Sequence, residues 1–146
     1  MPVNYSSPRD QTAYNILVWE IVRQVPAGNV TTYGQIAAMI PAPEETEASK
    51  YKAFGARWVG GAMAACPEGV PWQRVINSQG KISLGRKEAA LIQRDLLEDE
   101  GIQFDERDQV ELSRYGWSGP PEKWLQERGL LPPPGFPKPK QVEMDL

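Results

Sequence analysis

The sequence predicts a mainly α-helical domain of the winged-helix or helix-turn-helix type, with a small β-hairpin as its wing. Three observations support this fold class. An amphipathic helix comes first, a short helix, a loop and a further helix follow it, and an extended segment with a tight turn precedes a fourth helix. The length of 146 residues corresponds to about one domain.

The first helix is expected to follow a polar N-terminal extension, residues 1–11. Thr12 is a suitable N-cap, and Pro26 with Gly28 is expected to stop the helix. Its apolar residues recur at the spacing of one helix face, namely Tyr14, Leu17, Val18, Ile21, Val22 and Val25. This face is therefore predicted to pack on the core.

A second, shorter helix is predicted from Tyr33 to Ile40, after an extended link at residues 30–32. Either Thr31 or Thr32 is expected to cap it, with three apolar residues turned inward: Ile36, Ala37 and Ile40. Residues 41–49 contain two prolines and three glutamates, which predicts an exposed loop. A third helix is predicted over about residues 54–65.

The wing is predicted from an extended segment at residues 70–76, a turn at 77–80 and a returning strand at 81–83. A fourth helix over about residues 87–100 is expected to turn Ala89, Ile92 and Leu96 inward and to end at Gly101. One more short strand is expected at residues 110–112. The domain is predicted to span residues 12–118. Residues 119–146 form a Pro-rich C-terminal tail, expected to be disordered from Leu131 on.

The chain has no histidine and a single cysteine, Cys66. Nucleophile systems of the Ser-His-Asp and Cys-His kinds therefore lack their base, and His-ligated zinc sites lack their ligand. One cysteine also excludes a thiolate zinc cluster and a disulfide framework. We expect no metal site and no cofactor.

The net charge is −3, but the charges are segregated along the chain. Residues 49–94 carry eight basic and two acidic side chains, whereas the segments on either side are acidic. A basic middle third is typical of a surface for an anionic ligand such as nucleic acid. Chance clustering of solvated side chains is the alternative.

The predicted third helix contains Gly60 and Gly61 together with several alanines, so that one side is nearly bare. Each interior glycine costs about 1 kcal/mol of helix stability relative to alanine. Close approach to another backbone is the usual compensation. The sequence leaves open whether that backbone belongs to a neighbouring element or to a nucleic acid.

Three segments resemble the DNA-binding domain of the O6-alkylguanine-DNA alkyltransferases. They are residues 31–37 (TTYGQIA), 56–63 (ARWVGGAM) and 71–83 (PWQRVINSQGKIS), and the resemblance extends over about residues 10–118. Active members of that family carry Pro-Cys-His-Arg-Val, whereas this chain has Trp72 and Gln73 at the cysteine and histidine positions. An indole is no nucleophile and an amide is no general base. The chain thus resembles the alkyltransferase-like subfamily, whose members recognise the lesion without repairing it and pass it to nucleotide excision repair.

The resemblance implies roles for individual residues. Tyr33 would press on the phosphate of the nucleotide that rotates out, and Arg57 would enter the base stack beside the orphaned cytosine. Gly60 and Gly61 would let the helix enter the minor groove. Further DNA contacts are expected from Thr32 and Lys81, the latter to phosphate. The lesion pocket would be built from Trp72, Arg74, Ser83 and Arg86, with Arg74 bracing its loop against an acidic partner.

Three of these residues also have a purely structural alternative. Tyr33 and Trp72 suit core packing, and a lone arginine such as Arg57 is commonly only solvated. Gln73 departs from the histidine common even in the subfamily, but without a thiol there is nothing for a histidine to activate.

The favoured function is a non-enzymatic sensor of O6-alkylguanine in duplex DNA that acts as a monomer and hands the lesion to an unidentified excision-repair protein. One alternative is an alkyltransferase or other DNA-modifying enzyme that uses Cys66. Another is a winged-helix module for undamaged DNA or protein.

No apolar run approaches the about 18 residues that span a bilayer, and no signal pattern is present. We expect no membrane partner and a cytoplasmic location, at the nucleoid in a bacterium or in the nucleus of a eukaryote.

Overall fold

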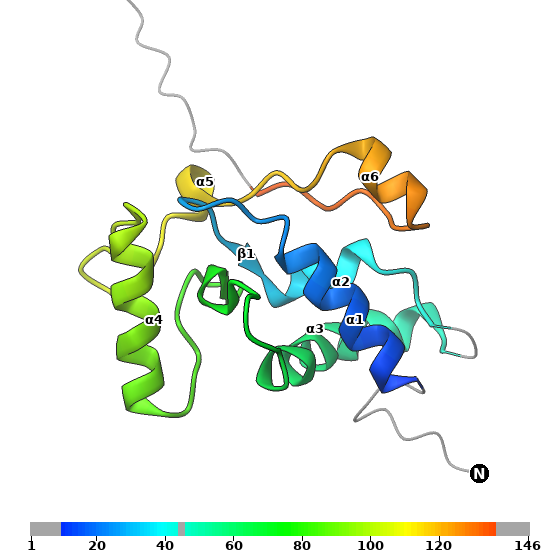
Figure 1. Cartoon of the computed structure of the whole chain (residues 1–146), viewed down its shortest axis with the longest axis horizontal. Coiled ribbons are helices and arrows are strands. Elements are labelled where there is room, and N and C mark those ends of the chain that lie inside the picture. Colours follow the sequence, from blue (N-terminus) through cyan, green and yellow to red (C-terminus); the bar gives the residue numbers. More distant parts are fainter. Residues whose placement is uncertain (1–9, 44–45, 137–146) are drawn as a thin grey trace, which may run out of the picture.

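The computed structural model describes residues 10–43 and 46–136 and confirms a mainly α-helical fold (Figure 1). The predicted extension up to residue 9 and the tail from residue 137 lie outside the described residues. The elements follow in the order α1 (Gln11–Val22), β1 (Thr31–Thr32), α2 (Tyr33–Met39), α3 (Ala48–Ala64), the 3-10 turn η1 (Trp72–Arg74), β2 (Val75–Ile76), α4 (Lys87–Asp99), α5 (Leu112–Tyr115) and α6 (Glu122–Glu127).

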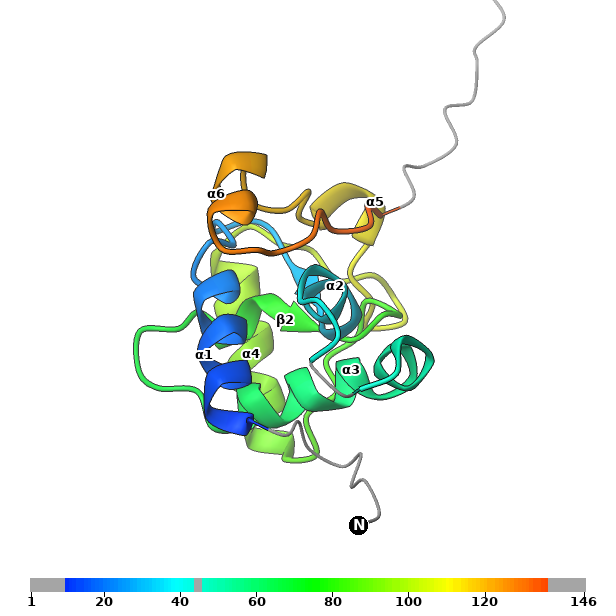
Figure 2. The same ribbon diagram turned by 90° about the vertical axis from the view of Figure 1, so that its right-hand side faces the viewer.

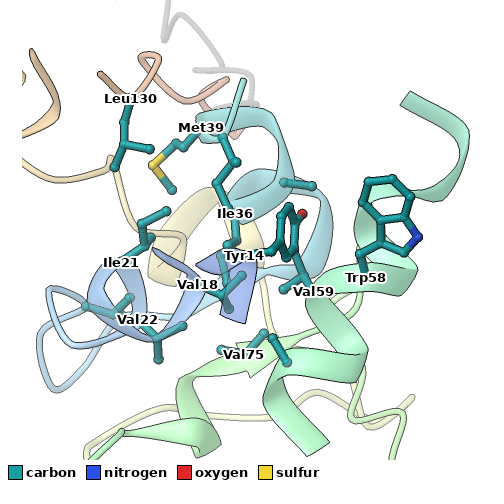
Figure 3. Packing of buried hydrophobic residues seen from close by; sticks show 14 of the residues in the cluster. Tyr14, Val18, Ile21, Val22, Ile36, Met39, Trp58, Val59, Val75 and Leu130 are labelled. Carbon is teal, nitrogen blue, oxygen red and sulfur yellow. The ribbon is translucent and has the colours of Figure 1, made fainter. Parts of the chain in front are cut away.

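Helix α1 buries the face that its periodicity predicts. The carboxylate of Asp10, and not Thr12, caps it by accepting a hydrogen bond from the Ala13 amide at 3.0 Å. Figure 3 shows its apolar side chains meeting those of α2, α3 and β2 in a first core. Residues that the figure labels there include Val18, Ile21, Ile36, Met39, Val59 and Val75.

Helices α2 and α3 pack closely on each other and on α1, as a helix-turn-helix unit requires. Thr32 is the N-cap of α2, as predicted, and its hydroxyl accepts a hydrogen bond from the Gln35 amide at 3.0 Å. Helix α3 begins at Ala48, earlier than predicted, because its first turns bury Tyr51. The Tyr51 hydroxyl donates to the Ala37 carbonyl at 2.8 Å and thereby ties α3 to α2.

The sheet differs from the predicted hairpin wing. Strand β1 pairs in parallel with β2, with Thr31 opposite Val75 and Thr32 opposite Ile76. The turn at residues 77–80 is present, and the Asn77 amide donates to the Lys81 carbonyl at 3.0 Å. Residues 81–83, however, form no strand. The predicted hairpin is wrong because buried β1, distant in sequence, takes the position beside β2 that the returning strand was expected to fill.

Helix α4 is rotated relative to its predicted orientation. Ile92 is 54% exposed, whereas Gln93, at 2%, and Leu97 point inward. The amide of Gln93 donates to the carbonyls of Gln73 at 3.0 Å and Val75 at 2.9 Å, which explains why a polar residue is buried here. As predicted, the helix ends before Gly101, whose φ of 91° suits glycine.

A second core lies beneath α4. It contains Val30, Ile76, Leu97, Ile102, Val110 and Tyr115. Figures 1 and 2 place the short sheet between α4 and α2, so that it joins the two cores. The strand predicted at residues 110–112 is reduced to a single bridge between Phe104 and Val110, after which α5 begins.

The C-terminal part of the described chain packs on the domain. Both views show α6 and the segment after it lying over the α1–α2 end of the molecule (Figures 1 and 2). Leu125 and Leu130 are buried in the first core, and the Leu131 amide donates to the Met39 carbonyl at 2.8 Å. The expected disorder from Leu131 on is therefore wrong for residues 131–136.

Candidate nucleic-acid interface

One face of α3 is uncovered and carries almost no side chains. Arg57, Gly60, Gly61 and Ala64 follow the spacing of one helix face, and all are exposed except the half-buried Gly60. A Cβ atom added at Gly60 or Gly61 would meet nothing within 4 Å. Packing against a neighbouring element therefore does not explain these glycines.

The glycine that does allow close helix packing is Gly55. A Cβ there would lie 3.1 Å from the Cβ of Ala37 and 3.2 Å from the Tyr51 ring. No local signal in the sequence marks Gly55, since its role depends on the α2–α3 contact. Gly60 and Gly61 thus leave a smooth outward surface beside the Arg57 guanidinium.

Tyr33 and Thr32 lie at the start of α2. The Tyr33 ring packs against the first core but stays half-exposed, so the core alternative describes only part of its environment. Thr32 is 3% exposed, and its hydroxyl is engaged in capping α2. The side chain of Thr32 is thus engaged within the fold, and a contact between Thr32 and DNA stays a prediction.

Trp72, the first residue of η1, is half-buried and belongs to neither core among the described residues. It lines a cavity of about 460 Å³. The other walls come from the C-terminal end of α3 and the loop after it, including Met63, Cys66, Pro67 and Glu68. The indole therefore borders an open space instead of filling the interior.

Arg74 braces this segment, as predicted. Its Nε lies 2.9 Å from Oε1 of Glu100 and its Nη2 3.2 Å from Oε2, while Nη1 donates to the Val25 carbonyl at 2.8 Å. Gln73 adds a hydrogen bond from Nε2 to Oε2 of Glu100 at 2.8 Å. Burial alone would raise the pKa of Glu100, but these hydrogen bonds and the Arg74 charge outweigh it and hold the pKa below its usual value.

The other predicted pocket residues do not line the cavity beside Trp72. Arg74 borders a separate hollow with Arg23, Gly69, Val70 and Pro71. Ser83 and Arg86 are exposed in the segment that leads into α4. Lys81 lines another hollow, beside α4. Of the four residues predicted for the pocket, the structure brings only Trp72 to this cavity.

Sequence reasoning missed several residues of the site. Met63 occurs in one of the quoted segments but was given no role, and Glu68 lies in the loop that forms a cavity wall. Glu100 and Gln93 hold η1 and β2 from α4. A buried amide and a distant glutamate leave no local signal that could have revealed these contacts.

Cys66 is half-buried at the cavity wall. Burial raises the pKa of its thiol, which keeps it protonated and weakly nucleophilic at neutral pH.

Within residues 10–43 and 46–136 no group of His, Cys, Asp and Glu side chains could hold a metal ion. No helix in that part of the chain is long and apolar enough to cross a membrane.

Together, the α2–α3 pair with its bare outer face defines a domain of the helix-turn-helix type. The family model described as "6-O-methylguanine DNA methyltransferase, DNA binding domain" matches residues 13–102. The chain belongs to this family and is one of its alkyltransferase-like proteins.

Similar proteins occur in bacteria and in yeast. A DNA base-flipping protein of Vibrio parahaemolyticus is 40% identical over 104 residues, which cover 70% of this chain and 93% of that protein. Alkyltransferase-like protein 1 of Schizosaccharomyces pombe is 38% identical over 110 residues, or 73% of this chain and 90% of that one. A crystal structure of the S. pombe relative in complex with damaged DNA containing O6-carboxymethylguanine matches with a TM-score of 0.54 and 33% identity, covering 73% and 95% of the two chains.

Proposed function

We propose that this protein is a non-enzymatic sensor that binds O6-alkylguanine in duplex DNA and holds the damaged nucleotide outside the base stack. The observation that carries the proposal is the placement of Trp72. A half-exposed indole borders a cavity of about 460 Å³ at the position where the alkyltransferases keep a reactive cysteine. Such a pocket can hold an alkylated base, but an indole stands where a reactive thiolate would accept the alkyl group.

The bare face of α3 is proposed to enter the minor groove. Gly60 and Gly61 let the helix backbone approach the DNA closely, and no contact within the described chain competes for that surface. Rotating a nucleotide out of the duplex costs a few kcal/mol. Arg57, exposed on the same face, would enter the stack and bond the orphaned cytosine, which offsets part of this cost.

Tyr33 is proposed to act on the backbone of the rotating nucleotide. Its ring is held by the first core on one side and exposed on the other, and the Thr32 cap fixes the start of its helix. A half-held aromatic ring is a rigid contact for a phosphate that must move. It costs little side-chain entropy because few torsions are free.

In the pocket, the alkyl group would lie against the indole of Trp72 and the side chains of Met63 and Cys66. No transfer is expected, because the indole is not nucleophilic and Gln73 cannot act as a base. The raised pKa of Cys66 weighs against its use as a substitute nucleophile. A protein that binds a lesion unchanged must leave its removal to others, and we include hand-over to nucleotide excision repair in the proposal.

Relatives support this reading through what they are named for or bound to. The Vibrio parahaemolyticus and Escherichia coli relatives are named DNA base-flipping proteins, and the yeast relative has been crystallised with damaged DNA. The coverage of about nine-tenths of the Vibrio and yeast proteins means that the likeness extends over nearly their whole length.

The proposal is tested by titrating labelled duplexes that contain O6-methylguanine or guanine at one position, at a fixed salt concentration. We expect a clear preference for the methylated duplex, and Tyr33→Ala should lower that affinity while the circular dichroism spectrum is unchanged. Equal affinity for both duplexes would favour a module for undamaged DNA. Intact-mass analysis after incubation separates the enzyme alternative, since a gain of one methyl group would contradict a pure sensor.

A further inference from the structure

A hollow of about 370 Å³ lies between residues 81–82, helix α4 and the loop at residues 104–108, and we propose that it docks an acidic protein segment carrying an apolar anchor side chain. We call it the α4 groove. Its charged lining residues are Lys81, Lys87, Arg94, Arg107 and Asp108, and its apolar ones include Ile82, Leu91 and Phe104. The inference does not depend on the proposed lesion binding.

The groove carries an excess of positive charge. Asp108 is paired with Arg94, since Nη1 of Arg94 lies 2.6 Å from Oδ1 of Asp108. The Nε atom of Arg94 also lies 3.1 Å from Oε1 of Glu98. In the described part of the chain, no salt bridge joins Lys81, Lys87 or Arg107 to an acidic group.

Asp105 offsets part of this positive charge. Its carboxylate lies in the field of Lys81 and Arg107 and accepts hydrogen bonds from the amides of Arg107 and Gln109, at 2.7 and 3.0 Å. The residues that line the groove still carry four positive charges against the one of Asp108, which favours an acidic ligand.

Apolar surface accompanies this charge. Leu91 is 55% exposed on α4, whereas Gln93 and Leu97 of the same helix are buried. Phe104 is half-buried, and the guanidinium of Arg94 lies 4.6 Å from its ring centroid, which holds the ring in place at the groove wall. An exposed leucine beside a preformed aromatic wall is the arrangement in which an apolar anchor of a partner is buried at an interface.

The combination favours a protein segment over a nucleic-acid backbone. Phosphates are bound by cations, hydroxyl groups and N–H groups, and they make no favourable contact with the apolar side chains of Ile82, Leu91 and Phe104. An acidic segment with one or two apolar side chains satisfies both parts of the lining. Acidic residues would pair with the unbridged cations at the rim and steer the encounter, while the apolar side chain fills the hollow.

The position of the groove leaves it free when α3 contacts another molecule. It shares no lining residue with the cavity beside Trp72. Helix α4 packs on η1 and the second core, whereas α3 belongs to the first core, and Figure 1 shows α4 at one side of the molecule apart from α3. A ligand on the bare face of α3 and a protein segment in the α4 groove can therefore be bound at the same time.

The test uses a fluorescein-labelled peptide of roughly a dozen residues, rich in Asp and Glu around a central Phe-Leu pair, titrated against the full chain. One control peptide has Ser-Ser at the centre, and another has every acid replaced by the corresponding amide. We expect the first peptide to bind at least about tenfold tighter than either control. Leu91→Gln and the double variant Lys87→Glu/Arg107→Glu should each weaken it by a similar factor, whereas Ile16→Gln and Lys123→Glu, at exposed sites on α1 and α6, should not.

Three results would overturn the inference. One is the absence of saturable binding up to millimolar protein. Another is equal binding of the Ser-Ser peptide, which would show that the groove attracts acidic peptides by charge alone and does not bind an apolar side chain. The third is that Lys87→Glu/Arg107→Glu weakens an unmodified DNA duplex as strongly as the peptide, which would assign the groove to a nucleic-acid surface. All the substituted side chains lie at the surface or the groove rim, so a thermal melt suffices to confirm that each variant is folded.

Discussion

Gln73 donates a hydrogen bond to Glu100 across 2.8 Å, although the two residues are far apart in the chain. The same carboxylate accepts hydrogen bonds from the Arg74 guanidinium, so that Glu100, at the end of α4, holds η1 and with it Trp72 in place. The position next to the missing nucleophile is therefore fixed by a carboxylate. This contact has consequences for stability and for chemistry.

Glu100→Gln should destabilise the fold by about 2 kcal/mol at neutral pH, because the Arg74 guanidinium would lose its charged partner in a mostly buried place. The pKa of Glu100 is lowered in the folded state, so its contribution is fully present above its ordinary pKa of about 4.5 and is lost as the pH falls through the lower folded-state value. Urea unfolding of both proteins between neutral pH and pH 3 measures the difference. A gap that does not shrink in acid would contradict this assignment.

Trp72→Cys alone should produce little alkyl transfer. The new thiol would lie beside Gln73, whose amide donates to Glu100 and cannot take a proton. Adding Gln73→His should raise the rate, since an imidazole at that position has the Glu100 carboxylate to orient it. Intact-mass analysis of both variants after incubation with O6-methylguanine duplex measures the transfer. Rapid self-methylation of the single variant would show that the thiol needs no base at position 73.

Gly61→Ala should stabilise the folded protein while weakening its binding to DNA. The added methyl group meets nothing within 4 Å, and alanine in a helix interior is favoured by about 1 kcal/mol. The same methyl group would stand on the face that we propose for the minor groove. Gly55→Ala is the matched control and should destabilise, because its Cβ would press on Ala37 and Tyr51. Thermal melts and duplex titrations of both variants separate the two roles, and unchanged DNA affinity of Gly61→Ala would remove this face from the interface.

Arg57→Ala should weaken binding to the methylated duplex more than Lys81→Ala does. Arg57 stands on the bare face of α3, whereas Lys81 lies at the α4 groove, apart from that face, and could reach at most a single phosphate of the duplex. Loss of one phosphate contact also lowers the salt dependence by about one counterion, whereas loss of an intercalated side chain does not. Titrations at two salt concentrations measure both effects. Equal losses with equal salt dependence would count against the wedge.

The sequence was most informative where structure is local. Helix α1 and the inward face of α2 follow from their apolar spacing, and Thr32 and Gly101 act at helix ends as their residue types predict. The three segments that resemble the alkyltransferases also identified the right family. Local signals failed where a distant partner decides the outcome.

Two errors show this limit. Ile92 is predicted to face inward but is exposed, and Gln93, for which the apolar spacing predicts no inward position, is buried. The Gln93 amide donates to two carbonyls of residues 73 and 75, which no pattern within α4 reveals. Likewise β2 pairs with β1, which precedes the helix-turn-helix unit in the chain, and not with residues 81–83, which follow the turn after β2. The pocket shows the same limit, since the resemblance places Ser83 and Arg86 with Trp72, and neither residue lines its cavity.

The Pro-rich segment after α6 offers a direct test of packing that composition did not predict. Leu130 is 7% exposed in the first core beside Met39 (Figure 3). Its neighbour Leu131 is 46% exposed, and only its amide N–H contacts Met39, by donating to the Met39 carbonyl. Leu130→Ala should therefore lower the free energy of unfolding by about 2–3 kcal/mol, as loss of a buried leucine does, and Leu131→Ala by less than about 0.5 kcal/mol. Urea unfolding of both variants measures the contrast. Small and equal effects would mean that the segment does not pack on the helices in solution and is disordered, as its proline content predicts.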